Sequence, residues 1–209
     1  MKNYVYIRAG LPDFKPDWRE GSRSLDDYMN EVRSLLSKKD NKVIDLICTG
    51  FDKDSITLDF YKETQKHPIK FIREFFLFDF NVRNAKVMYL NSALGREADK
   101  DVLSLFEYSE DSIEEPEEIE FEEEEKLQNI FEGKDILARE RAIDDLYWDK
   151  IDELTLFNYL DFTSILGLVV KMQIIMRWLK LDEETGREMF RRLVDEVRGT
   201  FTGVNYNEK

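Results

Sequence analysis

The stretch FTSILGLVVKMQIIMRWL, residues 162–179, decides the fold class of this chain. Eleven of the fifteen residues from Ile165 to Leu179 are Ile, Leu, Val, Met or Trp. At about 100° per residue these side chains surround the helix axis, and a helix that is apolar on every side is central or covered by a partner. Asp161 stands directly before the stretch as a candidate N-cap. We therefore predict a central, buried helix here.

Apolar periodicity predicts further helices on both sides of this one. They are expected after Ser24 and at 41–48, 68–94, 134–157 and 182–199. In the longest, Phe71, Phe75, Phe78 and Val82 form a seam on one face, and a glycine follows at position 95 as a stop signal. Residues 1–23 are expected to be irregular or partly extended, and residues 55–60 suit either a helix or a strand. With only 9 Gly and 4 Pro in 209 residues, the chain is predicted to be an all-α or predominantly α multi-helix bundle.

The net charge of −14 is concentrated in one segment. Residues 107–125 hold twelve carboxylates and no Lys or Arg, and without them the chain has 33 acidic and 31 basic residues. Such charge density is typical of a linker. We therefore predict an N-terminal helical lobe at 1–106, an acidic linker at 107–125, a C-terminal helical lobe at 126–199 and a tail at 200–209. The overall acidity argues against a nucleic-acid-binding surface.

The two lobes are predicted to be related. At an offset of 94 residues several apolar positions of the two most apolar helices coincide, Arg83 coincides with Arg177 and Lys86 coincides with Lys180. Each arginine is expected either to pack its stem on the core or to contact a partner. Any two buried helices share a 3.6-residue period, so the apolar matches are weak evidence for a repeat. The matched cations strengthen this evidence slightly.

The chain has little equipment for catalysis. It contains one His and one Cys, which cannot form a His/Cys zinc site, and it has no phosphate-binding glycine motif or nucleophile elbow. We predict no catalytic, cofactor-binding or metal-binding residues, and hence no enzyme. The alternative is a helical enzyme that uses carboxylates and a divalent cation, and its candidate residues are Asp144, Asp145, Asp149, Asp152 and Glu153. A second alternative is an adaptor that recruits a basic protein through the acidic segment. A single cysteine also fits a reducing, cytoplasmic setting.

Two stretches resemble the recurring helix of the V/A-type ATPase central-stalk subunit, which has the letter C in prokaryotic enzymes and d in eukaryotic ones. They are residues 78–86 (FDFNVRNAK) and residues 163–177 (TSILGLVVKMQIIMR). In that family a long apolar helix runs into a polar step and then an Arg-Asn pair, which Arg83 and Asn84 match. At Arg177 the next residue is Trp178, which departs from the pattern. Residues 4–12, 80–84 and 152–198 together resemble an uncharacterised bacterial family that is encoded beside V-type ATPase subunits.

The resemblance implies a non-catalytic, all-helical subunit that couples the rotary shaft to the membrane rotor ring in proton or sodium transport. Its partners would be protein subunits of the ATPase, with contact with the inner membrane only through them. Arg83, Asn84 and Arg177 are then the candidate partner-contact residues. The stalk subunit is typically a funnel of three related lobes, whereas this chain has room for about two.

Overall fold

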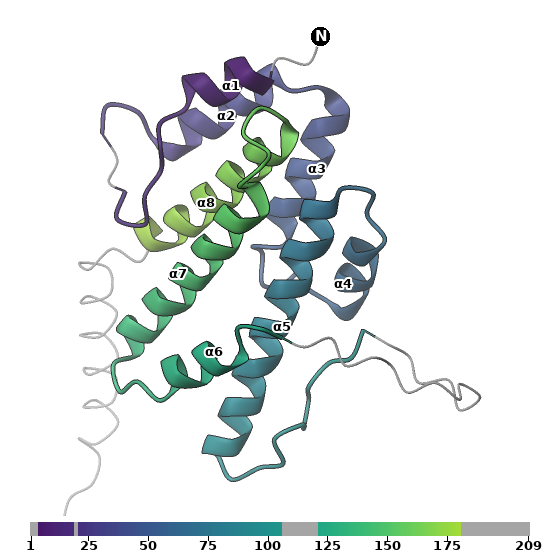
Figure 1. Cartoon of the computed structure of the whole chain (residues 1–209), viewed down its shortest axis with the longest axis vertical. Helices are drawn as coiled ribbons and strands as arrows, with labels where there is room; N and C mark the ends of the chain where they lie inside the picture. Colours follow the sequence, from purple (N-terminus) through teal and green to yellow (C-terminus); the bar gives the residue numbers. More distant parts are fainter. Residues whose placement is uncertain (1–3, 19–20, 106–120, 181–209) are drawn as a thin grey trace, which may run out of the picture.

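The computed structural model describes residues 4–18, 21–105 and 121–180. These residues form eight α-helices, and no strand occurs among them. Figure 1 shows α5, α7 and α8 as the long central elements, with α1, α2 and α3 gathered around one end. The helices are α1 (Tyr4–Gly10), α2 (Leu25–Leu35), α3 (Lys38–Thr49), α4 (Leu58–Gln65), α5 (Lys70–Ala93), α6 (Glu124–Phe131), α7 (Ile136–Thr155) and α8 (Phe162–Lys180). The all-α prediction is confirmed.

The central position predicted for residues 162–179 is also confirmed. Helix α8 packs against α1, α2, α3 and α7, and ten of its residues are buried. By length and composition alone α8 could cross a membrane, and it is the only such helix among the described residues. The fold explains its apolar surface by packing, because more than half of the apolar window is covered by other parts of the chain.

Local signals set several helix ends where the sequence predicts them. The Ser24 hydroxyl accepts a hydrogen bond from the Asp27 N–H, and the Asp27 carboxylate accepts one from the Ser24 N–H, which makes a capping box. Asp161 accepts a hydrogen bond from the Thr163 N–H at the start of α8. Gly95, at φ +67°, ends α5 in a Schellman motif in which the Arg96 N–H bonds to the Asn91 carbonyl.

Two segments expected to be irregular or ambiguous are helical. The expectation for residues 1–23 is wrong for Tyr4–Gly10, which form α1 because Tyr4 and Ile7 pack on the core and Tyr4 stacks on Phe162. Residues 55–60 contain no strand: Thr57 caps α4, and its hydroxyl accepts a hydrogen bond from the Phe60 N–H at 3.2 Å. In both cases packing against distant residues determines the secondary structure, because the segment is too short for its apolar periodicity to predict a helix.

The helices of the two predicted lobes share one core instead of packing separately. The larger apolar cluster joins residues of α1–α5 to residues of α7 and α8, and a smaller one joins α5 to α6 and α7. The acidic segment also ends earlier than predicted, because Glu124 and Glu125 open α6 and Phe121 packs on Phe78. Residues 107–120 of that segment, and the helix and tail predicted at 182–209, lie outside the described residues.

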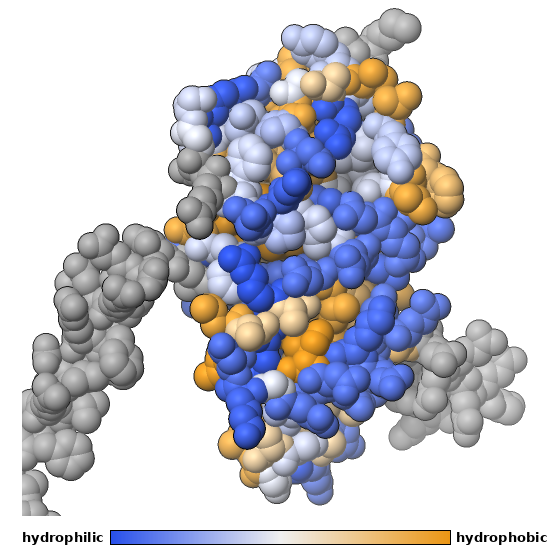
Figure 2. Space-filling view, turned by 60° about the vertical axis from the view of Figure 1, so that its left-hand side comes forward, coloured by the Kyte–Doolittle hydropathy of each residue, from blue (hydrophilic) through white to orange (hydrophobic). Residues whose placement is uncertain are grey.

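Many of the exposed apolar side chains lie near two ends of the body, while Ile136 and Leu137 at the start of α7 and Leu179 at the end of α8 are exposed as well. At one end are Val5 and Tyr6 of α1 and Leu156, Phe157, Tyr159 and Leu160 of the α7–α8 connection; at the other are Met88, Leu90 and Leu94 of α5 and Leu103 after it. Figure 1 places α1 and the α7–α8 connection at the top and the C-terminal end of α5 at the bottom. Figure 2 shows one face of the molecule, on which apolar residues form separate patches at both ends and in the lower half.

Gly167 allows α7 and α8 to approach closely, which gives the first prediction. A Cβ at this position would lie 2.7 Å from Cγ2 of Thr155, whose hydroxyl is bonded to the Ile151 carbonyl at 2.8 Å. We expect Gly167→Val to lower the free energy of unfolding by about 1–3 kcal/mol, as overpacked cores do, although valine is the better helix former. Urea denaturation measures this value.

Gly10→Ala is the matched control, since a Cβ there meets nothing within 4 Å. A Gly167→Val protein as stable as the Gly10→Ala protein would contradict the close packing of α7 on α8.

Candidate functional site

A buried carboxylate on α5 is the centre of the polar network. The Asp79 side chain is only 7% exposed. It accepts hydrogen bonds from the Tyr61 hydroxyl of α4 at 2.5 Å and the Tyr147 hydroxyl of α7 at 2.6 Å. Arg83, one turn further along α5, donates its Nε–H to the same carboxylate at 2.8 Å. Three helices are therefore joined through one side chain.

The electrostatics of this network keep its phenols protonated. Burial, and then the negative charge of Asp79, raises the pKa of Tyr61 far above its ordinary value. The same two causes raise the pKa of Tyr147. Burial acts in the opposite sense on Arg83, but the charge and hydrogen bond of Asp79 raise the pKa of its guanidinium. Asp79 and Arg83 thus form an ion pair supported by two neutral phenols.

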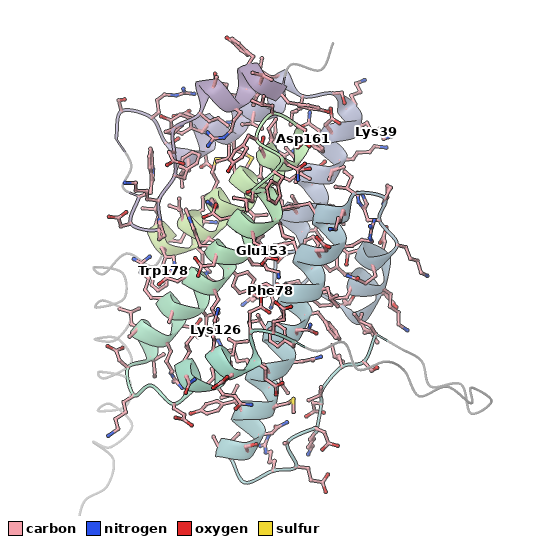
Figure 3. All side chains as sticks on the ribbon, viewed as in Figure 1. Lys39, Phe78, Lys126, Glu153, Asp161 and Trp178 are labelled. Carbon is pink, nitrogen blue, oxygen red and sulfur yellow. The ribbon has the colours of Figure 1, made fainter. Side chains whose placement is uncertain are left out.

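A second buried carboxylate lies on α7. Asp144 is 4% exposed and accepts hydrogen bonds from the guanidinium of Arg177 and from the indole N–H of Trp178, both on α8. Burial raises the pKa of Asp144 and outweighs the opposite effect of these two donors. The ring of Trp178, labelled in Figure 3 beside α7, is also covered by the guanidinium of Arg141.

The structure brings the two predicted arginines to the same cavity. Arg83 and Arg177, 94 residues apart in sequence, line a space of about 300 Å³ together with Asp79, Asp144 and Tyr147. The connection between α3 and α4 forms another wall, which includes Lys53. The arginine side chains are 46% and 47% exposed. Because a guanidinium carries five N–H donors, each arginine can hold its buried aspartate and still offer donors to an outside acceptor.

The charges of this cavity suit a negatively charged hydrogen-bond acceptor. Three cationic groups, Lys53, Arg83 and Arg177, face two buried carboxylates, which leaves the cavity with a net charge of +1. The tyrosine that lines it, Tyr147, is held in its neutral form by burial and by the nearby Asp79 carboxylate. A guanidinium fork matches the geometry of a carboxylate or a phosphate.

Asn84, the third predicted contact residue, lies elsewhere. Its amide N–H donates to the Leu103 carbonyl at 2.9 Å, and its carbonyl oxygen accepts from the Leu103 N–H at 3.2 Å. Consecutive residues of a helix project about 100° apart, so Asn84 cannot face the cavity that Arg83 lines. It holds the segment that follows α5 against the helix.

The carboxylates proposed for a metal-dependent enzyme do not converge. Asp144 faces α8 as described, whereas Asp152 pairs with Lys171 at 2.5 Å and Glu153 pairs with Lys150 at 3.0 Å. Asp145 and Asp149 are exposed. Within residues 4–18, 21–105 and 121–180 no group of three or more His, Cys, Asp or Glu side chains is placed to hold a metal ion.

The pairing of Asp79 with Arg83 can be predicted from their i,i+4 spacing, but the rest of the network is missed. Tyr61 and Tyr147 come from other helices, and no local pattern links them to Asp79. One signal lies in the sequence: Asp79 follows Ile72 and Phe76 at steps of four and three, so it lies on a second apolar face of the helix, which indicates that its carboxylate is buried.

Comparison with known families places the chain in one of them. The model of DUF2764, described as a protein of unknown function, matches residues 1–56 and 52–200. The chain belongs to the DUF2764 family. The match covers every helix that lines the cavity, and therefore both buried aspartates and both arginines. No curated protein and no solved structure matches the chain.

The raised pKa values of the two tyrosines predict a loss of stability at high pH. In the unfolded chain a tyrosine ionises near pH 10, whereas Tyr61 and Tyr147 stay protonated in the fold. Their contribution to stability is therefore complete below pH 10 and declines as the pH rises above it. We expect Tyr147→Phe to reduce this decline by about 1.4 kcal/mol per pH unit above pH 10.

Urea denaturation of both proteins between pH 8 and pH 11.5 measures the difference in slope. Tyr159→Phe, at an exposed tyrosine, is the control and should keep the slope of the unchanged protein. Parallel curves for the unchanged and Tyr147→Phe proteins would contradict a Tyr147 hydroxyl that stays protonated in the fold.

Proposed function

We propose that this protein is a non-catalytic structural subunit of a rotary ATPase, in the role of the central-stalk subunit that it resembles. It would connect the rotating shaft to the membrane rotor ring, in the cytoplasm and peripheral to the inner membrane through its partners. The observation that carries the proposal is the presence of exposed apolar patches at two ends of one helical body. A part that couples two partners needs two separate interfaces.

The body between the two patches is suited to transmitting force. The 24-residue helix α5 extends over about 36 Å at 1.5 Å per residue. It is held to α7 by Tyr147 and by the ion pair of Lys86 with Glu140 at 2.6 Å, and to α4 by Tyr61. Helices joined by buried polar contacts as well as apolar packing resist sliding past one another, because each displacement would leave a buried group unpaired.

The patches have the composition of protein interfaces. Phe157 is 90% exposed, and its neighbours Tyr159 and Leu160 are also exposed. Aromatic and aliphatic side chains gathered on a surface mark protein–protein contact sites, because a monomer gains nothing by leaving them in water. The sequence resemblance to the stalk subunit supports shaft and rotor-ring subunits as the partners of these two patches.

Affinity purification from the native host tests this proposal. We expect the tagged chain to co-purify with shaft and rotor-ring subunits of a V-type ATPase, identified by mass spectrometry. Phe157→Ser at one end and Leu94→Ser at the other should each lose a different partner by roughly tenfold or more, as loss of an interface anchor does. Both residues are exposed, so neither change should reduce stability.

Leu179→Ser, at an exposed leucine in the last turn of α8, which ends between the two patches in Figure 1, is the control and should retain all partners. The proposal would be contradicted if the unchanged chain captured no part of an ATPase, or if both end variants lost the same partner.

A further inference from the structure

A groove runs between α5 and α7, on a different part of the surface from the arginine cavity. It has a volume of about 560 Å³ and is closed at one end by residues 121–123 and at the other by the α7–α8 connection. Helices α5 and α7 run antiparallel along its sides (Figure 1). Phe78 of α5 and Glu153 of α7, both labelled in Figure 3, lie between the two helices and line the groove.

The floor of the groove is apolar except at Lys150, whose ammonium group lies over the ring of Phe78, 5.9 Å from its centroid. The apolar residues of the floor come from α5, from α7 and from residue 121. They are Phe71, Leu77, Phe78, Phe121 and Leu154. Leu77 is only half-buried and is not among the residues of either core cluster, so its apolar surface faces the groove. Phe157, the most exposed apolar side chain described, stands at the end of the groove. Apolar surface of this kind favours an apolar occupant.

The rim of the groove is acidic. Four carboxylates and two ammonium groups line the groove: Glu74, Glu122, Glu123, Glu153, Lys70 and Lys150. Lys70 pairs with Glu74, and Lys150 pairs with both Glu123 and Glu153. Since one lysine serves two glutamates and Glu122 adds a further charge, the groove keeps a net charge of −2. An occupant must therefore bring positive charge beside its apolar face.

The length of the groove fits a helix. On α5 the lining residues recur from Lys70 through Glu74 and Leu77 to Asn81, at steps of four, three and four. This stripe extends over about 16 Å, which equals three turns of α-helix. An amphipathic helix laid between two helices places its apolar face on the floor and its polar flanks on the rims.

We propose that the groove between α5 and α7 binds an amphipathic helix of a partner protein, about three turns long, with Lys or Arg on both flanks of its apolar face. A second copy of this acidic chain and an anionic membrane surface fit less well, because the rim would repel both. The inference goes beyond the proposed function, since it assigns a binding site and the chemistry of its ligand from the groove alone. Only the identity of that partner as an ATPase subunit rests on the proposed function.

The test uses a fluorescein-labelled peptide of about 18 residues, with leucines at helical spacing and lysines at the other positions. Fluorescence anisotropy measures its binding to the full chain. We expect the double substitution Glu74→Lys with Glu153→Lys to weaken binding roughly tenfold. Leu77→Ser should weaken binding while leaving the thermal melting temperature close to that of the unchanged protein.

The matched control separates the groove from overall charge. Glu63→Lys with Glu132→Lys makes the same change in net charge at exposed positions outside the groove. We expect this control to bind the peptide within about twofold of the unchanged protein, because distant surface charges are screened at physiological salt. Equal weakening of peptide binding by the two double variants would overturn the proposal. So would a failure of the unchanged chain to bind the peptide, or a dimer of the chain that Leu77→Ser dissociates.

The two proposals can fail separately. Peptide binding that depends on the groove, in a chain that captures no part of an ATPase, would support the groove and contradict the proposed function. Full co-purification of ATPase subunits with a Glu74→Lys, Glu153→Lys chain that also binds the peptide normally would contradict the groove and support the proposed function.

Discussion

The fold depends on a carboxylate that cannot be left alone in an apolar interior. Asp79 is buried among phenylalanines on α5, where an unpaired charge would cost several kcal/mol. Tyr61 from α4 and Tyr147 from α7 must reach it at hydrogen-bond distance, and Arg83 must neutralise it. These requirements fix the relative positions of three helices more closely than apolar packing alone can. The pairing of Asp144 with Arg177 and Trp178 does the same for α7 and α8.

Much of the fold could be predicted because its signals are local. The Ser24 capping box, the Asp161 cap and Gly95 mark helix ends within a few residues of sequence, and the apolar surroundings of α8 predict its central place. Helix α1 and the choice of helix over strand at α4 could not be predicted, since both depend on packing against distant residues. That the two predicted lobes share one core likewise depends on where α8 packs. Sequence periodicity does not predict which helices pack together.

The candidate site was predictable only in part. Two matched cations, Arg83 and Arg177, were selected by their place in an internal pattern, and the structure brings them to one cavity. The resemblance to the stalk subunit, through its Arg-Asn pair, adds Asn84, which instead holds the segment after α5 through Leu103. Neither the tyrosines nor the groove between α5 and α7 could be found by periodicity, because both arise where helices meet. Residues that act through contacts between helices are the ones that sequence patterns miss.

The chain forms a helical body with a charged cavity, an acidic groove and apolar patches at two ends. The central claim is that this body connects two partners within a rotary ATPase. Electron cryo-microscopy of the ATPase purified from the native host is the most direct test. We expect density for the eight helices between the shaft and the rotor ring, with each apolar end against a different partner. An intact enzyme without this density, or with the chain attached at one end only, would contradict the claim.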